Sequence, residues 1–328
     1  MGTQPLAGQD VLTPPAPMSS LFRARITHAD FPTPPELADR DPTVAPSEHV
    51  GGLRGELRLQ DGLVRLGRTY QQNPLRVLVP LQSAPGAPAL LFLLNGTAGL
   101  LDGDGQLVAL DAGPGVRCFV TNQSAGRVHP CPLGHASARF DLNLSAGSTL
   151  CVMPGPTIPF AGSRFHQRTT INLDPAAQIV WGDILLPGRT CYARAPERFV
   201  FDRLVQELQV RRGGRLVYHE RFAWVGPWSE EDVRWHFGDA EAVASLFVSG
   251  PVPRETLPDL PDGEIALQET AHGDTCVRLV GRDAERVIAA SARIALSAAA
   301  RLAGDSDPWL LDSTYLPGTH WFSPTPEA

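Results

Sequence analysis

Two histidines and a cysteine lie close together in the segment His129-Pro130-Cys131-Pro132-Leu133-Gly134-His135. Neutral imidazole and thiolate are ligands for zinc, copper and nickel. The two prolines stiffen the loop, which could either present these ligands or form a solvated turn. The spacing matches no standard zinc motif. His129, Cys131 and His135 are therefore one candidate metal site, and a solvated loop is the alternative.

A glycine-rich turn, Asn95-Gly96-Thr97-Ala98-Gly99-Leu100-Leu101-Asp102-Gly103-Asp104, follows an apolar run. Glycine admits positive φ and lets the backbone approach other groups closely. The pattern predicts a sharp turn from which Asp102 and Asp104 project. It is either a carboxylate or backbone-nest site or a tight turn between strands. Four histidines are isolated and are expected at the surface or in hydrogen bonds: His166, His219, His236 and His320.

No familiar catalytic signature is present. The sequence contains no Gly-x-Ser-x-Gly, and His219-Glu220 is not followed by the second histidine of a zinc protease helix. All 28 basic residues are arginine. A phosphate-binding loop, Schiff-base chemistry and kinase-type ATP binding each need a lysine, so these classes are excluded. We therefore expect a protein that is not an enzyme.

Composition excludes further classes of function. The net charge of −7 argues against a nucleic-acid partner. No apolar run approaches the roughly 20 residues that span a bilayer, and the N-terminus lacks a secretory pattern. The five cysteines are odd in number and show no Cys-x-x-Cys spacing. These features predict a cytoplasmic protein without a membrane partner.

The elements that must position these residues are mainly strands. Three copies of a phrase, Leu110–Val116, Leu144–Leu150 and Leu173–Ile179, each place five residues that contain a small or turn-forming tetrad between a leucine and an apolar residue. A β-rich run follows each copy. Such a recurring unit predicts stacked β-layers, although ordinary sandwiches contain similar phrases. The fold class expected is mainly β, with β-helix-like stacked sheets.

Short apolar runs predict strands, and two segments predict helices. The clearest helix runs from Asp283 to Leu302 near the C-terminus, with Asp283 as cap and Gly304 as its end, and a shorter one runs from Ser229 to His236. A Gly213-Gly214 pair predicts a hairpin. The expected strands are 56–59, 75–81, 89–95, 116–121, 140–144, 205–210, 215–222, 243–248 and 275–280.

Composition along the chain suggests three parts. Residues 1–50 hold nine prolines and little periodicity, and we expect a disordered or wrapping arm. Residues 51–305 form the predicted β scaffold domain, and residues 306–328 form a C-terminal tail.

Several segments in a fixed order carry a family resemblance. They are Arg68–Val77, Asn95–Asp104, Thr121–Val128, Pro154–Phe160, Trp181–Ile184, Gly188-Arg189 and Arg211–Arg215. In this order the chain resembles the UreD (UreH) urease accessory proteins over roughly residues 51–305. The resemblance implies a cytoplasmic, non-catalytic scaffold that acts as a chaperone in nickel delivery. Its implied partners are apo-urease and the UreF-type and UreG-type accessory proteins, with nickel in transit rather than permanently bound.

The resemblance also implies site residues. Nickel passing through the protein body would need buried polar groups, for which Asp104, Gln123 and Asp183 are the candidates. Arg127 and Arg189 are candidates for partner binding.

The chain departs from the family pattern at three positions. His129 replaces a tyrosine, Pro156 replaces a glutamate, and Asp183 shortens a glutamate. A divergent paralogue that binds or senses metal for another client is therefore one alternative. A carbohydrate-active enzyme on a β-helix is the other.

Overall fold

The structure is a computed structural model, and it describes residues 25–45, 49–192, 197–226, 228–307 and 309. Strands dominate, and within these residues there are two α-helices, which confirms the mainly β fold class. The strands are β1 (Val50–Gln60), β2 (Leu63–Gln72), β3 (Leu75–Val77), β4 (Ala89–Asn95), β5 (Gly105–Ala112), β6 (Arg117–Asn122), β7 (Gly126–Val128), β8 (Ala136–Leu144), β9 (Thr149–Met153), β10 (Pro156–Pro159), β11 (Arg164–Leu173), β12 (Gln178–Leu185), β13 (Arg203–Arg212), β14 (Arg215–Val225), β15 (Ala242–Val248), β16 (Gly263–Glu269) and β17 (Thr275–Gly281). The helices are α1 (Glu230–Phe237) and α2 (Ala284–Ala303).

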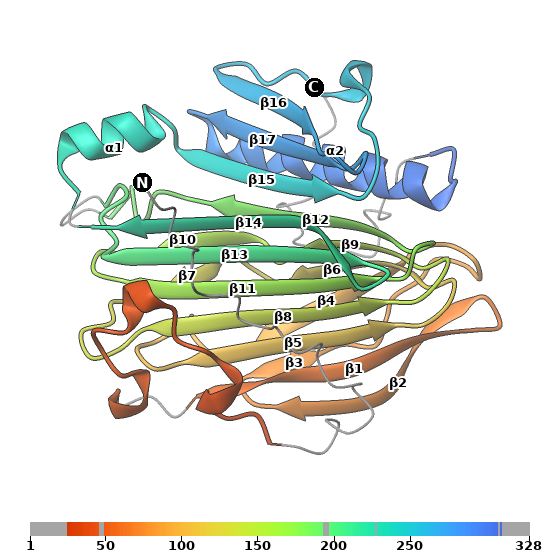
Figure 1. Ribbon diagram of the computed structural model, residues 1–328, viewed down its shortest axis with the longest axis horizontal. Coiled ribbons are helices and arrows are strands. Elements are labelled where there is room, and N and C mark those ends of the chain that lie inside the picture. Colours follow the sequence, from red (N-terminus) through yellow and green to blue (C-terminus); the bar gives the residue numbers. More distant parts are fainter. Residues whose placement is uncertain (1–24, 46–48, 193–196, 227, 308, 310–328) are drawn as a thin grey trace, which may run out of the picture.

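Two sheets pack face to face (Figure 1). Sheet A has the order β14-β13-β11-β8-β5-β1-β2, and sheet B has the order β16-β17-β15-β12-β9-β6-β4-β3. From β4 to β13 the long strands alternate between the sheets. From β5 onward, each of these long strands pairs in parallel with the preceding long strand of its own sheet, as β8 does with β5 and β9 with β6, whereas β4 pairs antiparallel with β3.

The repeated leucine phrases mark the turns between the two sheets. Leu144 pairs with Leu173, as the second and third copies predict. The first copy is two residues out of register, because Ala112 rather than Leu110 pairs with Leu144. The backbone N–H of Ser145 donates to the carbonyl of Ala112 at 2.9 Å, so neighbouring turns are hydrogen-bonded to each other.

The main core lies between the sheets. Because side chains alternate along a strand, one face of each strand points inward. The inward residues of sheet A include Leu110, Leu142 and Ile171, and those of sheet B include Val120, Val152 and Trp181. The ring of Trp181 packs edge-on against Phe140, with 5.0 Å between the ring centroids.

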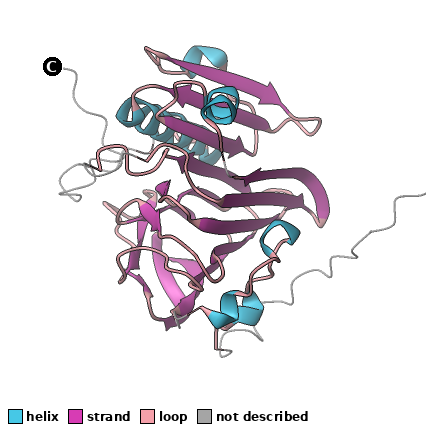
Figure 2. Ribbon diagram, turned by 90° about the vertical axis from the view of Figure 1, so that its left-hand side faces the viewer, coloured by secondary structure: helices cyan, strands magenta, loops and turns pink. Residues whose placement is uncertain are grey.

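Helix α2 covers the outer face of sheet B (Figure 2). Its N-terminus is capped by Asp283, whose carboxylate accepts a hydrogen bond from the N–H of Arg286 at 3.1 Å. It ends at Gly304, which has a φ of 77° and takes the left-handed conformation that favours glycine. Both ends confirm the prediction. No described helix combines the length and the apolar character that crossing a membrane requires.

Residues 25–45, here called the N-terminal segment, lie across the outer face of sheet A. They form three short 3₁₀-helices, at His28–Asp30, Pro35–Leu37 and Pro42–Val44. Ile26 and Phe31 pack on Leu107 and Ala109 of β5. The predicted domain boundaries stay a prediction, and residues 1–24, 46–48, 308 and 310–328 of the predicted arm and tail lie outside the described residues.

Candidate functional site

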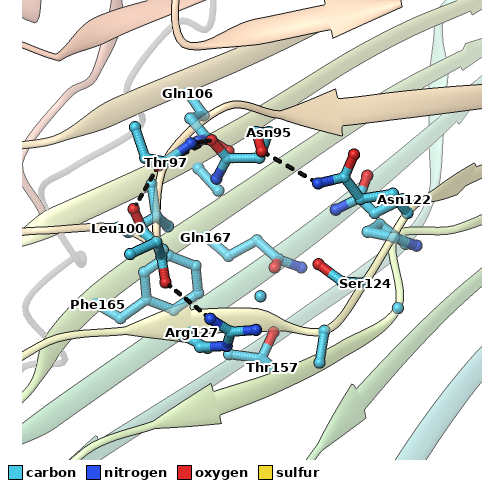
Figure 3. A pocket seen from close by; sticks show the side chains of 18 of the residues that line it. Asn95, Thr97, Leu100, Gln106, Asn122, Ser124, Arg127, Thr157, Phe165 and Gln167 are labelled. Atoms are coloured by element: carbon cyan, nitrogen blue, oxygen red, sulfur yellow. Dashed lines mark hydrogen bonds between the residues drawn. The ribbon is translucent and has the colours of Figure 1, made fainter. Parts of the chain in front are cut away.

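A polar cavity of about 150 Å³ opens between the two sheets (Figure 3). Amide side chains dominate its polar lining, and no aspartate or glutamate is among the described residues that line it. The polar lining residues are Asn95, Thr97, Gln106, Asn122, Gln123, Ser124, Arg127, Thr157 and Gln167.

Strand register places two glutamines on one side of this cavity. Gln106 of β5 and Gln167 of β11 both pair with Ala138 of β8, so the three residues form one row across sheet A. Their side chains point inward, because each lies an even number of positions along its strand from a residue of the core, as Gln167 does from Ile171. The small Ala138 side chain between them leaves the space that the cavity occupies.

The turns after β4 and β6 form the opposite wall. The side-chain oxygen of Asn95 accepts hydrogen bonds from the backbone N–H and the hydroxyl of Thr97, at 3.0 and 2.8 Å. The carbonyl of Asn95 accepts one from the amide of Gln123 at 3.1 Å. These bonds fix the wall, whereas the buried Nε2 of Gln106 has no hydrogen-bond partner among the described protein atoms.

Gln167 connects the cavity to Asp183. Its Nε2 donates to Oδ1 of Asp183 at 2.5 Å, and Nε1 of Trp181 donates to Oδ2 at 2.5 Å. Burial raises the pKa of Asp183 above its usual range, against the opposing effect of these two hydrogen bonds. The carboxyl group is thus held directly behind the cavity wall.

The polar row continues beyond Asp183 on sheet B. Asp183 pairs with Ser245, and Ser245 pairs with Arg278, so the three side chains share one face. Arg278 donates to the hydroxyl of Ser245 at 2.5 Å and forms an ion pair with Glu220 of sheet A. A polar row therefore crosses the interior from the cavity to an ion pair between the sheets.

This arrangement suits brief contact with a small hydrated cation better than permanent binding. Amide and carboxylate oxygens are hard ligands that accept divalent ions while some waters are retained. Among the described residues, no group of three or more histidine, cysteine, aspartate or glutamate side chains could hold a metal ion.

The three predicted path residues do not all meet. Gln123 lines the cavity, and Asp183 is reached through Gln167. Asp104 is outside the cavity lining and is 2% exposed. Its Oδ2 accepts a hydrogen bond from the backbone N–H of Leu101 at 2.8 Å, so it helps to close the predicted turn.

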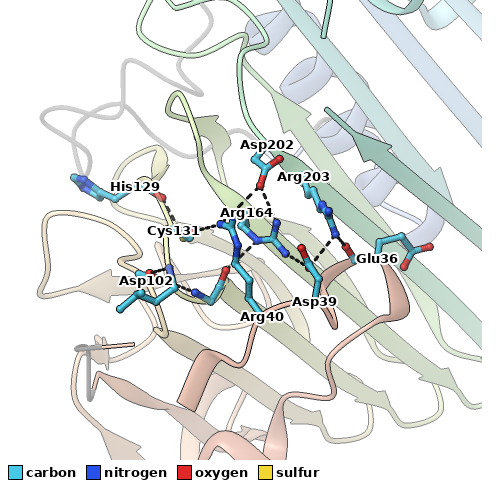
Figure 4. Close-up of polar contacts among 11 residues, drawn as sticks. Glu36, Asp39, Arg40, Asp102, His129, Cys131, Arg164, Asp202 and Arg203 are labelled. Atoms are coloured by element: carbon cyan, nitrogen blue, oxygen red, sulfur yellow. Dashed lines mark hydrogen bonds and ion pairs between the residues drawn. The ribbon is translucent and has the colours of Figure 1, made fainter. Parts of the chain in front are cut away.

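Asp102 has a similar structural role (Figure 4). Its carboxylate accepts hydrogen bonds from the backbone N–H groups of Leu133 and Gly134, at 2.7 and 2.8 Å. It thereby ties the turn after β4 to the loop that follows β7. Of the two interpretations of this segment, the contacts of Asp102 and Asp104 are those of a tight, fixed turn.

His129, Cys131 and His135 face different surroundings. The ring of His129 packs on Phe160, with 5.0 Å between centroids. The thiol of Cys131 donates to the carbonyl of His129 at 3.2 Å, and burial raises the pKa of Cys131 to about 11. His135 is buried, and neither ring nitrogen has a hydrogen-bond partner among the described protein atoms. Metal binding by these residues stays a prediction.

His135 and His166 lie under the N-terminal segment. Burial, with a smaller effect of the Arg164 charge, lowers the pKa of His135 to about 4. Burial also lowers the pKa of His166 to about 4, with His135 as the next cause. His166 is 4% exposed, so the expectation of a surface histidine was wrong, and its Nε2 lacks a hydrogen-bond partner among the described atoms. The covering segment, which the sequence did not place here, is the reason.

Arg164 holds the N-terminal segment to sheet A (Figure 4). Its fully buried guanidinium forms ion pairs with Asp39 of the segment and, at 2.7 Å, with Asp202. It also donates to the carbonyl of Gly134 at 3.0 Å. Arg203 adds a second ion pair to Asp39 at 2.9 Å.

The two arginines predicted to bind a partner differ in how many contacts their guanidinium groups make within the chain. Arg127 is exposed at the cavity wall, and its guanidinium lies 3.4 Å from the carbonyl of Ala98. Arg189 lies over the rings of Phe160 and Tyr192, 4.3 Å from each centroid, and pairs with Glu197. Arg189 is therefore already engaged within the chain.

Sequence reasoning missed Gln106, Gln167, Arg278 and Glu220. A signal existed for Gln167, because it interrupts the inward, mainly apolar positions of β11. Strand alternation alone could have identified it as a buried polar residue, although not its contact with Asp183.

Comparisons with known proteins agree with one another. The family model described as "UreD urease accessory protein" matches residues 49–310. Urease accessory protein UreD 3 of Methylorubrum populi is 34% identical over 176 residues, which cover 52% of this chain and 56% of that protein. Urease accessory protein UreD 2 of Streptomyces griseus is 32% identical over 252 residues, which cover 72% of this chain and 83% of that protein. The matched part thus spans little more than half of the Methylorubrum relative and most of the Streptomyces relative.

Proposed function

This chain belongs to the UreD family of urease accessory proteins, and on that premise we propose that it assists nickel insertion into apo-urease. Its relatives are named accessory proteins rather than enzymes. We infer a cytoplasmic scaffold that works with UreF-type and UreG-type partners. Because the chain contains no lysine for a phosphate-binding loop, any nucleotide hydrolysis would come from a partner.

The observation that supports a role in metal transfer is the polar row that runs from the cavity through Gln167 to Asp183. Burying polar side chains in a core costs free energy unless they are hydrogen-bonded, and apolar residues would pack there without this cost. A nickel ion in transit, which is cargo, would meet amide oxygens in the cavity and then one carboxyl group. Such contacts favour passage over retention, because they supply too few charged ligands for a closed site.

The test is substitution of Asp183 in cells that co-express urease and the other accessory proteins. Asp183→Asn retains an oxygen that can accept from Trp181 but removes the carboxylate. We expect the nickel content and active fraction of urease to fall several-fold, while the complex with the accessory proteins still forms.

Asp104→Asn is the control, because Asp104 is a buried aspartate whose carboxylate accepts from the backbone N–H of Leu101, whereas that of Asp183 contacts the lining residue Gln167. We expect it to leave nickel content unchanged once its folding is verified. Full nickel content with Asp183→Asn, or equal losses with both variants, would refute the assignment of the row.

A further inference from the structure

Helix α1 presents a tryptophan to solvent. Trp235 is 84% exposed, the largest exposed fraction among the large hydrophobic residues that the structure describes. The helix projects beside the end of β14 (Figure 1). Two other apolar residues of the helix face the core: Phe237 is 5% exposed and Val233 packs beside it in the same cluster. An amphipathic helix would normally turn its aromatic residues to the core, so the position of Trp235 needs an explanation.

The helix is held firmly on its inner side. The ring of Phe237 stacks on Phe199, with centroids 3.9 Å apart and an interplanar angle of 3°. The guanidinium of Arg198 donates to the carbonyls of Gly238 and Ala240, each at 2.9 Å, directly after the helix ends. These contacts fix the C-terminal end of the helix.

The N-terminal end is fixed as well. Ser229 and Asp232 form a capping box, in which the hydroxyl of Ser229 accepts from the N–H of Asp232 at 3.1 Å and the Asp232 carboxylate accepts from the N–H of Ser229 at 2.9 Å. A helix of two turns fixed at both ends is a rigid support. An aromatic side chain on a rigid support loses little conformational entropy when a partner covers it.

The helix face one turn before Trp235 is acidic, whereas the exposed Arg234 next to it in the chain does not share its face. Glu231 lies four residues before it and Asp232 three residues before it, and side chains at these spacings share one face of a helix. Both acidic residues are exposed. Any partner that covers Trp235 therefore also meets negative charge.

An open hollow of about 470 Å³ follows directly after α1 and extends the acidic surface. Its charged lining residues are Asp239, Asp262, Glu264 and Arg282. Arg282 pairs with Asp239 at 3.0 Å, but the two side chains are 67% and 75% exposed, so this pair is open to exchange with a partner. We call these four residues the acidic hollow.

We propose that Trp235 and the acidic hollow form a docking surface for a basic segment of a partner protein. Arginine or lysine side chains of the partner would pair with the carboxylates, and an arginine could also stack on the indole. Tryptophan at the centre of an interface is a frequent determinant of affinity. The surface is distinct from the cavity and from the polar row.

The choice of probes rests on the proposed function. Purified apo-urease, UreF-type and UreG-type proteins from the same source would each be tested for binding to the full chain by biolayer interferometry, at low and at high salt. We expect at least one to bind, more weakly at high salt. Trp235→Ala should weaken that binding about 30-fold or more, as for an interface hot spot. The double variant with Asp262→Arg and Glu264→Arg should weaken the same binding about 10-fold.

Matched controls separate the surface from general effects. Val79→Ala changes another strongly exposed apolar residue, and Glu269→Arg reverses an exposed charge elsewhere on β16; both should bind as the wild type does. Unchanged melting temperatures would show that each variant is folded. If the wild type binds and Trp235→Ala binds equally well, the docking surface is refuted and the proposed function stands. If the wild type binds none of the three proteins, both proposals fail.

Discussion

Two buried histidines should make the stability of this protein depend steeply on pH. His135, directly before β8, and His166, in the neighbouring strand β11, lie under the N-terminal segment, and the pKa of each is lowered from 6.5 to about 4. The groups that act on His135 are Arg164, Asp102, Asp39 and Asp41. Burial is the largest cause for both rings, so the folded state favours neutral imidazole.

The sign and size of the effect follow from proton linkage. The unfolded chain binds a proton at each imidazole near pH 6.5, whereas the folded chain does so only near pH 4. The stability from keeping each ring neutral is therefore fully present above pH 6.5 and is lost as the pH falls toward 4. Between pH 7 and pH 5 this amounts to about 2 kcal/mol for each histidine.

The perturbation is His135→Leu, alone and with His166→Leu. Both ring nitrogens of His135 lack a described hydrogen-bond partner, so leucine should change stability at pH 7 by less than about 1 kcal/mol. The free energy of unfolding would be measured by urea denaturation at pH 7 and at pH 5. From pH 7 to pH 5, the free energy of unfolding of His135→Leu should fall by about 2 kcal/mol less than that of the wild type.

His272→Ala is the control, since His272 is exposed and its loss should leave the pH dependence unchanged. Carboxyl groups add their own pH dependence, but the difference between the wild type and His135→Leu isolates the imidazole. A wild type equally stable at pH 7 and pH 5 would refute the reasoning. A His135→Leu variant with the same pH dependence as the wild type would refute the role of this residue.

Two further substitutions test the packing. Arg164→Leu leaves Asp39 and Asp202 without their buried partner, and it should lower the free energy of unfolding, measured by urea denaturation, by about 3 kcal/mol. The control is Arg58→Ala, which removes an exposed arginine and should cost less than about 1 kcal/mol. Equal losses for the two variants would contradict the assigned role of Arg164. Gly182→Ala would place a Cβ 2.7 Å from Leu246 and should cost about 1–3 kcal/mol by overpacking under α2. Its control is Gly126→Ala, where the nearest atom is 3.9 Å away, and equal melting temperatures for the two variants would show that the site under α2 can expand.

Local chemistry in the sequence was enough to predict several elements. Asp283 and Gly304 mark the ends of α2 because a capping carboxylate and a left-handed glycine act on the residues next to them. The Gly213-Gly214 hairpin was predicted for the same reason, and both glycines have positive φ. The predicted strand 75–81 was too long, since β3 ends at Val77 and Leu81 makes only an isolated bridge. Pro80 lacks the N–H that a continuous strand would need.

The pairing register of the strands could not be predicted from the sequence. The leucine phrases correctly marked successive turns between the sheets, but the first copy was aligned on Leu110 although Ala112 pairs with Leu144. Similarity between short sequence repeats does not show which residues of two neighbouring strands pair with each other. Hydrogen bonds between neighbouring strands decide the pairing, and a shift by two residues keeps every side chain on the same face.

The sequence by itself determined the strand-rich fold, the helix ends, the absence of lysine chemistry and the family resemblance. Each depends on composition or on residues near one another in the chain. Only the tertiary structure decided which polar residues meet: Gln106, Gln167 and Asp183 come together, whereas Asp104 does not. Alternation along a strand tells which side chains share a face. Which faces meet across the two sheets depends on the packing of the whole chain, and the candidate site lies at that contact.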